Sequence, residues 1–463
     1  MHFDKNHDIA LIANDSSTMT YSELLDVSAV FSRYLIPRSL VLSLCENSIA
    51  SVAGYCSFLN NQVVPILYSN KADLELIADA LGTYTPRYLY IPSYRCEEFP
   101  SYDVIYRFRN YALLENRAVS LVHIHQDLGL LLSTSGSTGS RKLVRLSYNN
   151  IESNAKAIAS YLGIDKYQRA ITSLPMNYVY GLFVINSHLV SGATVLLTDD
   201  SVIMKSFWDF FKREHATSLA GVPWTFEQLK RIRFSRMELP TLQYITQSGG
   251  KFSYELQKEF ADLLQAQGKK LFVMYGQTEG TGRMFYLPSE LSGIKIGSIG
   301  KPLEIGRAEL VDEEGHLLEE AESEGELVYY GTNVSMGYAE TLYDLGKADE
   351  NCGRLLTGDI AKRDEDGYYY IVGRKKRFLK IYGNRISLDE VDRLVKQKFC
   401  DVDCASTGQD DYLKVYIDQA DVVSDVRQYI SSVLNISEKN TTVDYISCIP
   451  KNESGKVIFA KLV

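Results

Sequence analysis

Short apolar runs alternate with amphipathic helical patterns over the first 280 residues, and this alternation constrains the fold most. The runs VLSLC, LGLLLS, ATVLLT and LFVMYG have the length and composition of buried strands. Segments such as NNIESNAKAIASYL and SYELQKEFADLLQ carry apolar residues at helical spacing between the strands. Helices between successive strands favour parallel pairing, so the pattern predicts layered α/β subdomains with largely parallel sheets. Thr20 and Glu23 carry the signature of a capping box, which predicts a helix beginning at Tyr21.

The pattern of apolar and polar residues changes after residue 294. AELVDEEGHLL, GELVYYG and GYYYIVG predict short strands separated by acidic turns, as in a smaller β subdomain. The last ninety or so residues, with patterns such as SLDEVDRLVKQKF and LKVYID, predict a compact α+β domain. We therefore expect a large N-terminal domain, residues 1–373, and a small mobile C-terminal domain, residues 374–463.

The composition argues against several classes of function. The net charge of -9 disfavours attraction to nucleic acid or to an anionic membrane. The longest apolar stretch, VYGLFVINSHLV, is too short and too polar to span a bilayer. The N-terminus, MHFDKNHDIALIAND, has acids where a secretory signal has bases. We therefore expect a cytoplasmic protein with no membrane span and no nucleic-acid partner.

Cysteine and histidine give no sign of a metal site. The seven cysteines include no CxxC pair, so free thiols are expected rather than disulfides or zinc ligands. His123 and His125 form the only tight histidine pair. They lie in a strand-like segment and are interpreted as surface or edge-strand histidines.

The segment STSGSTGSRKLV, residues 133–144, has the chemistry of a phosphate loop. Glycines let backbone N–H groups turn toward an anion, hydroxyl side chains add donors, and Lys142 adds a charge. The segment is not a Walker loop, because Lys142 follows Gly139 by three residues and leucine comes next. Taken alone, the segment is equally consistent with a flexible surface loop.

Further motifs follow in a fixed order. They are LPMNYVYGL, QSGGK, YGQTEGTGR, GELVYYGTNVSMGY, TGD, GRKKR, KIYGNRISLDEVD and PKNESGK. With the phosphate loop, this order resembles the adenylate-forming superfamily of acyl-CoA synthetases, peptide-synthetase adenylation domains and luciferase-like enzymes. The resemblance covers nearly the whole chain. It implies ATP-dependent activation of a carboxylic acid to acyl-AMP and pyrophosphate, followed by thioester formation with CoA.

The resemblance also implies a role for each motif residue in the first step. The phosphate loop would hold the β- and γ-phosphates of ATP through Thr134, Ser135, Gly136, Ser137, Thr138, Gly139 and Lys142. Glu279 would coordinate Mg²⁺, and Thr278 would donate to the α-phosphate. Tyr275 would stack on adenine. Gly249 and Gly250 would let the backbone approach the nucleotide and the acyl group.

The C-terminal motifs complete this assignment. Asp359 would accept both ribose hydroxyls, and Arg374 would reach the ribose or a phosphate. Lys456 would bridge the attacking carboxylate and the α-phosphate. The small domain would rotate about a hinge at Lys376 between the two half-reactions. Gly383 would then line the tunnel for the pantetheine arm of CoA or of a carrier protein.

The acyl group is constrained mainly by Tyr178. Amino-acid-activating relatives usually carry aspartate here, and burying an ammonium group without such a partner would be costly, so an ordinary α-amino acid is disfavoured. Tyr178 and Gly249 are the predicted acyl-pocket residues. The aromatic side chains of Trp224, Tyr180 and Phe183 suggest an apolar or aryl lining of that pocket. Each of the three could instead belong to the hydrophobic core, and for Tyr180 and Phe183 this reading is equally favoured.

Several alternatives remain open from sequence. The acyl-AMP could be transferred to carrier-protein phosphopantetheine or to an amine, or it could be oxidised. The chain could also be a catalytically silent nucleotide-binding protein, although the joint presence of the five motif residues disfavours this reading: Lys142, Glu279, Asp359, Arg374 and Lys456. The run RKKR could be a nuclear-localisation patch, which the negative net charge disfavours.

Overall fold

The computed structural model describes residues 6–133, 142–382, 384–451 and 457–462, with the side chains of 376, 384, 385 and 460 left out. Contacts divide the described chain into two compact units. The first unit comprises residues 6–133, 142–307 and 330–355, and the second comprises residues 308–329 and the described residues from 356 onward. The predicted division into residues 1–373 and 374–463 stays a prediction.

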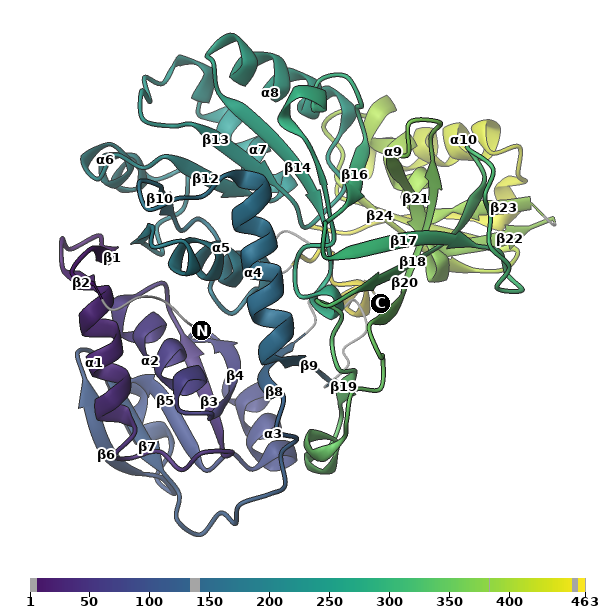
Figure 1. Ribbon diagram of the computed structural model, residues 1–463. Helices are drawn as coiled ribbons and strands as arrows, with labels where there is room; N and C mark the ends of the chain where they lie inside the picture. Colours follow the sequence, from purple (N-terminus) through teal and green to yellow (C-terminus); the bar gives the residue numbers. More distant parts are fainter. Residues whose placement is uncertain (1–5, 134–141, 383, 452–456, 463) are drawn as a thin grey trace. The chain divides into compact units, whose positions relative to one another are not determined.

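One sheet of the first unit has the strand order β19-β9-β8-β4-β3-β5-β7-β6. Its strands are β3 (Leu40–Cys45), β4 (Val64–Ser69), β5 (Tyr88–Pro92), β6 (Asp103–Phe108), β7 (Tyr111–Glu115), β8 (Leu128–Ser133), β9 (Leu143–Ser147) and β19 (Tyr338–Ala339). Strands β8, β4, β3 and β5 pair in parallel, as the alternation predicted. Three helices lie beside this sheet: α1 (Tyr21–Phe31), α2 (Ile49–Asn60) and α3 (Leu74–Tyr84) (Figure 1).

The other strands of the first unit follow the order β2-β1-β11-β10-β12-β13-β14-β15-β16. They are β1 (Ile9–Ala13), β2 (Thr18–Thr20), β10 (Arg169–Ile171), β11 (Thr194–Leu197), β12 (Ser218–Gly221), β13 (Tyr244–Gln247), β14 (Lys270–Tyr275), β15 (Phe285–Leu287) and β16 (Ser298–Pro302). The central six, from β1 to β14 in that order, pair in parallel. The helices here are α4 (Tyr148–Leu162), α5 (Val179–Val190), α6 (Lys205–Arg213), α7 (Pro223–Arg231) and α8 (Tyr254–Ala266).

Three helices join the two sheets of the first unit into one core. Residues of α2, α4 and α5 pack in one buried cluster with strand residues from both sheets, including Leu132 of β8 and Val195 of β11. Figure 1 shows α4 running between the sheets. The helix starts are set locally: the predicted capping box forms, with Thr20 accepting from the Glu23 N–H at 3.2 Å and the Glu23 carboxylate accepting from the Thr20 N–H at 2.7 Å.

The second unit has its own hydrophobic core. The unit contains most residues of four strands that are neighbours in one sheet. They are β17 (Gly306–Val311), β18 (Glu324–Gly331), β20 (Arg354–Arg363) and β21 (Tyr369–Arg374). The hairpin of β22 (Phe378–Ile381) and β23 (Asn384–Ser387) follows, and then the strands β24 (Cys404–Gln409), β25 (Tyr412–Ile417) and β26 (Thr441–Tyr445) with α9 (Leu388–Lys398) and α10 (Val423–Val433). Leu379, Val391, Val415 and Ile430 belong to one buried cluster of this α+β part. The predicted mixed α/β class, with a small C-terminal α+β part, is confirmed.

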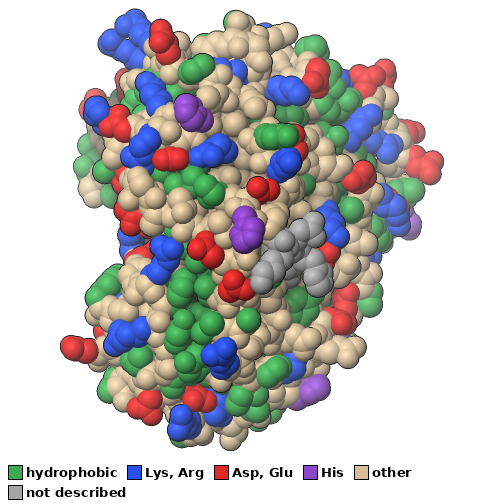
Figure 2. All heavy atoms as spheres, turned by 60° about the vertical axis from the view of Figure 1, so that its left-hand side comes forward, with side chains coloured by type: hydrophobic (Ala, Val, Ile, Leu, Met, Phe, Trp, Pro, Cys, Tyr) green, Lys and Arg blue, Asp and Glu red, His purple; other side chains and the backbone are tan. Residues whose placement is uncertain are grey.

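Surface features add little to the functional argument. Lys and Arg side chains are interspersed with Asp and Glu on the face drawn in Figure 2. Within the described residues, no helix is long and apolar enough to cross a membrane. His123 and His125 lie in an irregular segment rather than in the predicted strand, because the His125 N–H donates to the Leu345 carbonyl oxygen at 2.8 Å instead of to a strand neighbour.

Candidate active site

A glycine pair ends strand β13 at the carboxyl edge of its parallel strands, where ligands of α/β proteins usually bind. Gly249 has a φ of +85°, which side chains rarely tolerate. A Cβ atom built on Gly249 would lie 2.6 Å from the Tyr178 hydroxyl and 3.0 Å from Val222 Cγ1. Gln247 donates to the Gly250 carbonyl oxygen at 3.0 Å and fixes the turn. The structure thus brings the two predicted pocket residues, Tyr178 and Gly249, into contact.

Tyr178 stands at the N-terminus of α5 with most of its side chain covered. Burial raises the pKa of the Tyr178 hydroxyl to about 12, and the positive charge of Arg283 works in the opposite direction. The hydroxyl therefore stays protonated at neutral pH and serves as a neutral hydrogen-bonding group. Tyr178 and Tyr180 meet edge to face, with ring centroids 6.4 Å apart.

We expect Gly249→Ala to lower acyl-adenylate formation at least about tenfold, because the new methyl group fills the space in front of Tyr178 and the backbone strain is about 1–2 kcal/mol. Gly268→Ala is the matched control. Gly268 has a similar φ of +67°, but a Cβ atom there meets nothing within 4 Å. Initial rates of pyrophosphate release and the melting temperature are measured for both variants. Equal losses of activity in both variants would show that strain, not pocket shape, matters.

The loop after β14 carries three predicted residues and is held firmly. Tyr275 ends the strand, and Thr278 and Glu279 begin the short 3₁₀ helix η3 (Thr278–Gly280). The buried Asn333 side chain donates to the carbonyl oxygens of Gly280 and Arg283 at 2.9 and 2.8 Å. A further donor, the Asn154 side chain, reaches the Arg283 carbonyl oxygen at 2.7 Å. These bonds to buried amides fix the position of the loop, and with it the Glu279 backbone.

Glu279 and Lys142 are connected through one tyrosine. The Tyr338 hydroxyl donates to Glu279 Oε1 at 2.7 Å, and Lys142 Nζ lies 3.8 Å from the centroid of the Tyr338 ring. A cation held over an aromatic face is stabilised without neutralising its charge. The other carboxylate oxygen of Glu279 has no partner among the described residues, so the donor set fits a hard cation such as Mg²⁺.

Sequence reasoning missed the role of Tyr338. The residue closes the motif GELVYYGTNVSMGY, which was matched as a whole and not residue by residue. Strand β19 places Tyr338 opposite Val144 of β9, and β9 begins at the residue that follows Lys142. The pairing joins segments almost 200 residues apart, so no local pattern in the sequence could reveal it.

Asp359 and Arg374 meet within the second unit. Strands β20 and β21 pair them directly, and Arg374 Nε lies 2.7 Å from Asp359 Oδ1. Asp359 is 2% exposed, while the Arg374 side chain is half exposed. An arginine beside a buried aspartate pairs with the carboxylate and orients it. The predicted ribose-binding pair is therefore adjacent.

Lys376 lies between two anchored neighbours in the 3₁₀ helix η6 (Lys375–Arg377). On one side, Lys375 forms an ion pair with Glu326 of β18 at 2.6 Å. On the other, Arg377 pairs with Asp389 and Asp392 of α9 at 2.6 and 2.8 Å. Lys375 thus contacts the β strands and Arg377 contacts the terminal α+β part, which the Arg374 N–H also reaches by donating to Asp389 Oδ2 at 3.3 Å.

Some predicted residues lie outside the described part of the chain. These are Thr134, Ser135, Gly136, Ser137, Thr138, Gly139, Gly383 and Lys456. The described residues on either side of the last segment are held together, since Lys451 and Val457 form an antiparallel bridge and the Ile458 N–H donates to the Pro450 carbonyl oxygen at 2.8 Å.

The suggested apolar lining is only partly supported. Trp224 is 41% exposed at the start of α7, whereas Tyr180 and Phe183 are fully buried core residues.

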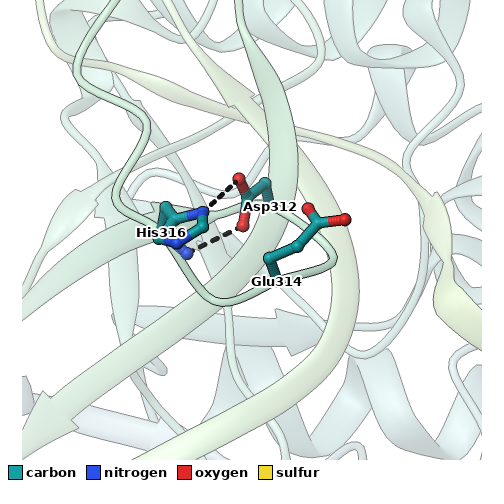
Figure 3. Close-up of side chains that lie close together, drawn as sticks. All are labelled: Asp312, Glu314 and His316. Atoms are coloured by element: carbon teal, nitrogen blue, oxygen red, sulfur yellow. Dashed lines mark hydrogen bonds and ion pairs between the residues drawn. The ribbon is translucent and has the colours of Figure 1, made fainter.

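Asp312, Glu314 and His316 cluster in the turn after β17 (Figure 3). The Asp312 carboxylate accepts from the His316 N–H at 2.7 Å and lies 3.1 Å from His316 Nδ1, so the turn accounts for the cluster without an ion.

Comparisons with known proteins agree with this fold. The sequence model of the AMP-binding enzyme family matches residues 3–339. The chain therefore belongs to the AMP-binding enzyme family.

Curated relatives include several CoA ligases. The chain is 31% identical to an oxalate–CoA ligase of Arabidopsis thaliana over 60% of this chain and 54% of that protein. It is 25% identical to a 2-succinylbenzoate–CoA ligase of Staphylococcus epidermidis over 84% of this chain and 79% of the relative. The match thus spans only about half of the oxalate–CoA ligase, and more of the second relative.

Solved structures show the same fold. The o-succinylbenzoate CoA synthetase of Bacillus subtilis, in complex with its acyl-adenylate intermediate, superposes with a TM-score of 0.80 at 21% identity, covering 98% of this chain and 95% of that one. ATP-bound MatB of Rhodopseudomonas palustris has a TM-score of 0.78 at 19% identity and covers 100% and 96% of the two chains.

Proposed function

We propose that this protein is an ATP-dependent carboxylic acid–CoA ligase, which forms acyl-AMP and pyrophosphate and then a thioester. The observation that carries the proposal is the cluster of Lys142, Tyr338 and Glu279 beside the loop that follows β14. The relatives named as CoA ligases support CoA as the acceptor. Transfer to carrier-protein phosphopantetheine or to an amine is the alternative, and a cytoplasmic location is part of the proposal.

The first step brings a carboxylate against a polyanion, so the site must neutralise charge and align the reactants. Lys142 and the phosphate loop, Thr134 to Gly139, would hold the β- and γ-phosphates. Bound Mg²⁺ would neutralise phosphate charge, and Glu279 would hold it there. Thr278 would donate to the α-phosphate.

The remaining residues would place the adenosine and the acid. Tyr275 would stack on adenine, and Asp359 would accept the ribose hydroxyls with Arg374 beside it. Gly249 and Gly250 give backbone access to the acyl carbon. Lys456 would bridge the attacking carboxylate and the α-phosphate.

The second step needs a different arrangement of the C-terminal domain, because a thiol must reach the acyl carbon that Lys456 served. We propose rotation about Lys376, after which Gly383 would line the tunnel for the pantetheine arm. We place the hinge here because the Lys375–Glu326 and Arg377–Asp389 ion pairs can persist while Lys376 changes its backbone angles, and the bond from the Arg374 N–H to Asp389 would break on rotation.

We expect Lys376→Pro to leave pyrophosphate release intact and to slow thioester formation at least about tenfold. Proline fixes φ near −65°, which suits the 3₁₀ conformation here but not a large change of that angle. Lys439→Pro, in the exposed 3₁₀ helix η8 (Glu438–Asn440), is the control; it also removes the bond from the Lys439 N–H to Ser437 Oγ at 3.3 Å, so it is the more disruptive proline of the two locally. Single-turnover assays separate the two half-reactions. Equal loss of both half-reactions in Lys376→Pro would count against rotation.

The function itself is tested by pyrophosphate release across a panel of carboxylic acids, each with and without CoA. The panel covers short and long aliphatic, aryl, hydroxy and amino acids. Release with one acid class, raised by CoA, is the expected result. Release that CoA does not change would favour a carrier protein or an amine acceptor. No pyrophosphate release with any acid, together with no rise of the melting temperature of the protein on adding ATP and Mg²⁺, would contradict the proposal.

A further inference from the structure

The guanidinium of Arg377, one residue beyond the proposed hinge, joins three separate segments of the second unit. Its ion pairs with two aspartates reach helix α9. Its Nη1 donates to the Ser406 carbonyl oxygen of β24 at 3.1 Å. The guanidinium carbon also lies 4.3 Å from the centroid of the Phe459 ring, in the 3₁₀ helix η9 (Phe459–Lys461). One side chain thus holds α9, β24 and η9 together.

The Phe459 ring belongs to a short segment that packs on strands β24 and β25. Phe459 and Val457 lie against a small buried cluster. That cluster contains Ala405 of β24, Tyr416 of β25 and Leu462. The ring therefore has apolar contacts from this cluster and a cationic contact from Arg377.

The contact between Arg377 and Phe459 is strong enough to affect a segment of this size. A guanidinium over an aromatic face contributes about 0.5–2 kcal/mol, with the larger values where the pair is desolvated. The Arg377 side chain is 16% exposed, and its ion pairs already fix the plane of the group. Segments with few buried contacts open at a small cost in free energy. Loss of this contact is therefore expected to loosen residues 457–462 before the rest of the α+β part.

The position of this segment matters because Val457 directly follows Lys456, the proposed bridge between the attacking carboxylate and the α-phosphate. Lys456 itself lies outside the described residues. Consecutive Cα atoms are about 3.8 Å apart, so a fixed Val457 limits where the Cα atom of Lys456 can lie. Misplacement of a reacting group by about 1 Å can lower a rate by up to about 100-fold.

We propose that Arg377 is a positioning residue for the adenylation step. Through the Phe459 ring, it makes the segment next to Lys456 move with α9 and β24 as one body when the chain turns at Lys376. This inference rests on the proposed ligase function and deepens it by naming what sets the position of the catalytic lysine. Since thiol capture makes no use of Lys456, the contact with Phe459 acts on the first half-reaction alone.

The main test is Phe459→Leu, because leucine keeps apolar contacts with the cluster and removes the cation-binding face. Phe399→Leu is the matched control. Phe399 is also partly buried in the α+β part, and its ring meets Tyr429 edge to face with centroids 5.8 Å apart. Phe459→Tyr keeps the aromatic face and is the conservative variant. Phe459→Leu is also made in two backgrounds, Arg377→Met and Lys456→Ala.

We expect Phe459→Leu to lower the kcat of acyl-AMP formation about tenfold. The KM for ATP and thioester formation from supplied acyl-AMP should stay within about twofold of wild type. Phe459→Tyr and Phe399→Leu should keep wild-type rates. In both backgrounds Phe459→Leu should cause no further loss, because a ring that acts through Arg377 on Lys456 has no effect once either is missing.

Three outcomes would overturn the inference. They are normal adenylation by Phe459→Leu, an equal loss of both half-reactions in that variant, and a further tenfold loss in the Lys456→Ala background. Arg377→Met also leaves two carboxylates of α9 without their cation, which lowers stability by itself. The Lys456→Ala background therefore decides the test if the Arg377→Met protein does not fold.

Failure of the ligase function would look different, since the wild-type protein would then form no acyl-AMP with any acid. Amide hydrogen exchange decides the inference in that case. The Ile458 N–H, which donates to the Pro450 carbonyl oxygen, should exchange at least about tenfold faster in Phe459→Leu than in wild type. It should exchange at the wild-type rate in Phe399→Leu. Unchanged exchange in Phe459→Leu, or equally fast exchange in Phe399→Leu, overturns the inference.

Discussion

Replacement of Lys456 by alanine is expected to lower acyl-AMP formation by at least about 100- to 1,000-fold and to leave thiol capture of supplied acyl-AMP intact. The lysine would neutralise charge that develops as the carboxylate attacks the α-phosphate. Removing a charged group that stabilises a transition state lowers the reaction rate by a factor of this order. Thiol capture starts from acyl-AMP that already exists, so it makes no use of that interaction. The two half-reactions are measured separately, by pyrophosphate release and by CoA-thioester formation from synthetic acyl-AMP.

Lys451→Ala is the matched control for Lys456→Ala. Lys451 lies in the same motif-bearing end of the chain, and it pairs with Asp403 at 2.5 Å, which helps to hold the pKa of Asp403 below its ordinary value. Its loss should lower stability by about 1 kcal/mol, since the pair is partly exposed and Asp403 keeps its ion pair with Lys396 at 3.1 Å, and both half-reactions should be retained. Normal adenylation by Lys456→Ala would refute the assigned role. Loss of both half-reactions would point to a structural role instead.

The alternation of apolar runs and helical patterns was enough to predict the central parallel strands. Buried strands such as β3 read as continuous apolar runs because both faces are covered. Antiparallel partners such as β6, β15 and β16 were not predicted, because they are short and pair across turns without a long apolar run. The irregular segment at His123 and His125 was taken for a strand because its alternation is similar.

The site was predictable to the extent that its residues lie in motifs. Tyr178, Gly249, Glu279 and Asp359 could be proposed as site residues from their positions in an ordered set of motifs. The contact of Tyr338 with Glu279 could not be predicted, because it depends on pairing across the fold rather than on neighbours in sequence.

Buried amides explain why these separate motifs act together. Asn150 donates to the carbonyl oxygens of Thr332 and Val334, both at 2.8 Å, and Asn333 then donates to the loop that carries Glu279. Helix α4, the segment before β19 and the loop after β14 are therefore connected by bonds to backbone. Since each amide would be unsatisfied if any segment moved away, the connection resists independent motion of the three segments.

Replacement of Glu279 by glutamine is expected to lower acyl-AMP formation at least about 100-fold and to raise the Mg²⁺ concentration needed for half-maximal rate. The amide keeps the size of the side chain and can still accept from the Tyr338 hydroxyl. What it lacks is the charge that holds a hard cation on the phosphates. Glu259→Gln, on the exposed side of α8, is the control and should behave as wild type. A large loss of activity at unchanged Mg²⁺ dependence would contradict the metal-binding role.

Tyr338→Phe separates charge from positioning at the same site. The phenylalanine keeps the ring under Lys142 and removes only the hydroxyl that orients Glu279. We expect a loss of about tenfold, with the Mg²⁺ dependence shifted in the same direction as in Glu279→Gln. Because the hydroxyl acts through the carboxylate, the double variant should be no worse than Glu279→Gln alone. Additive losses in the double variant would mean that Tyr338 acts on the nucleotide or on Lys142 independently of Glu279.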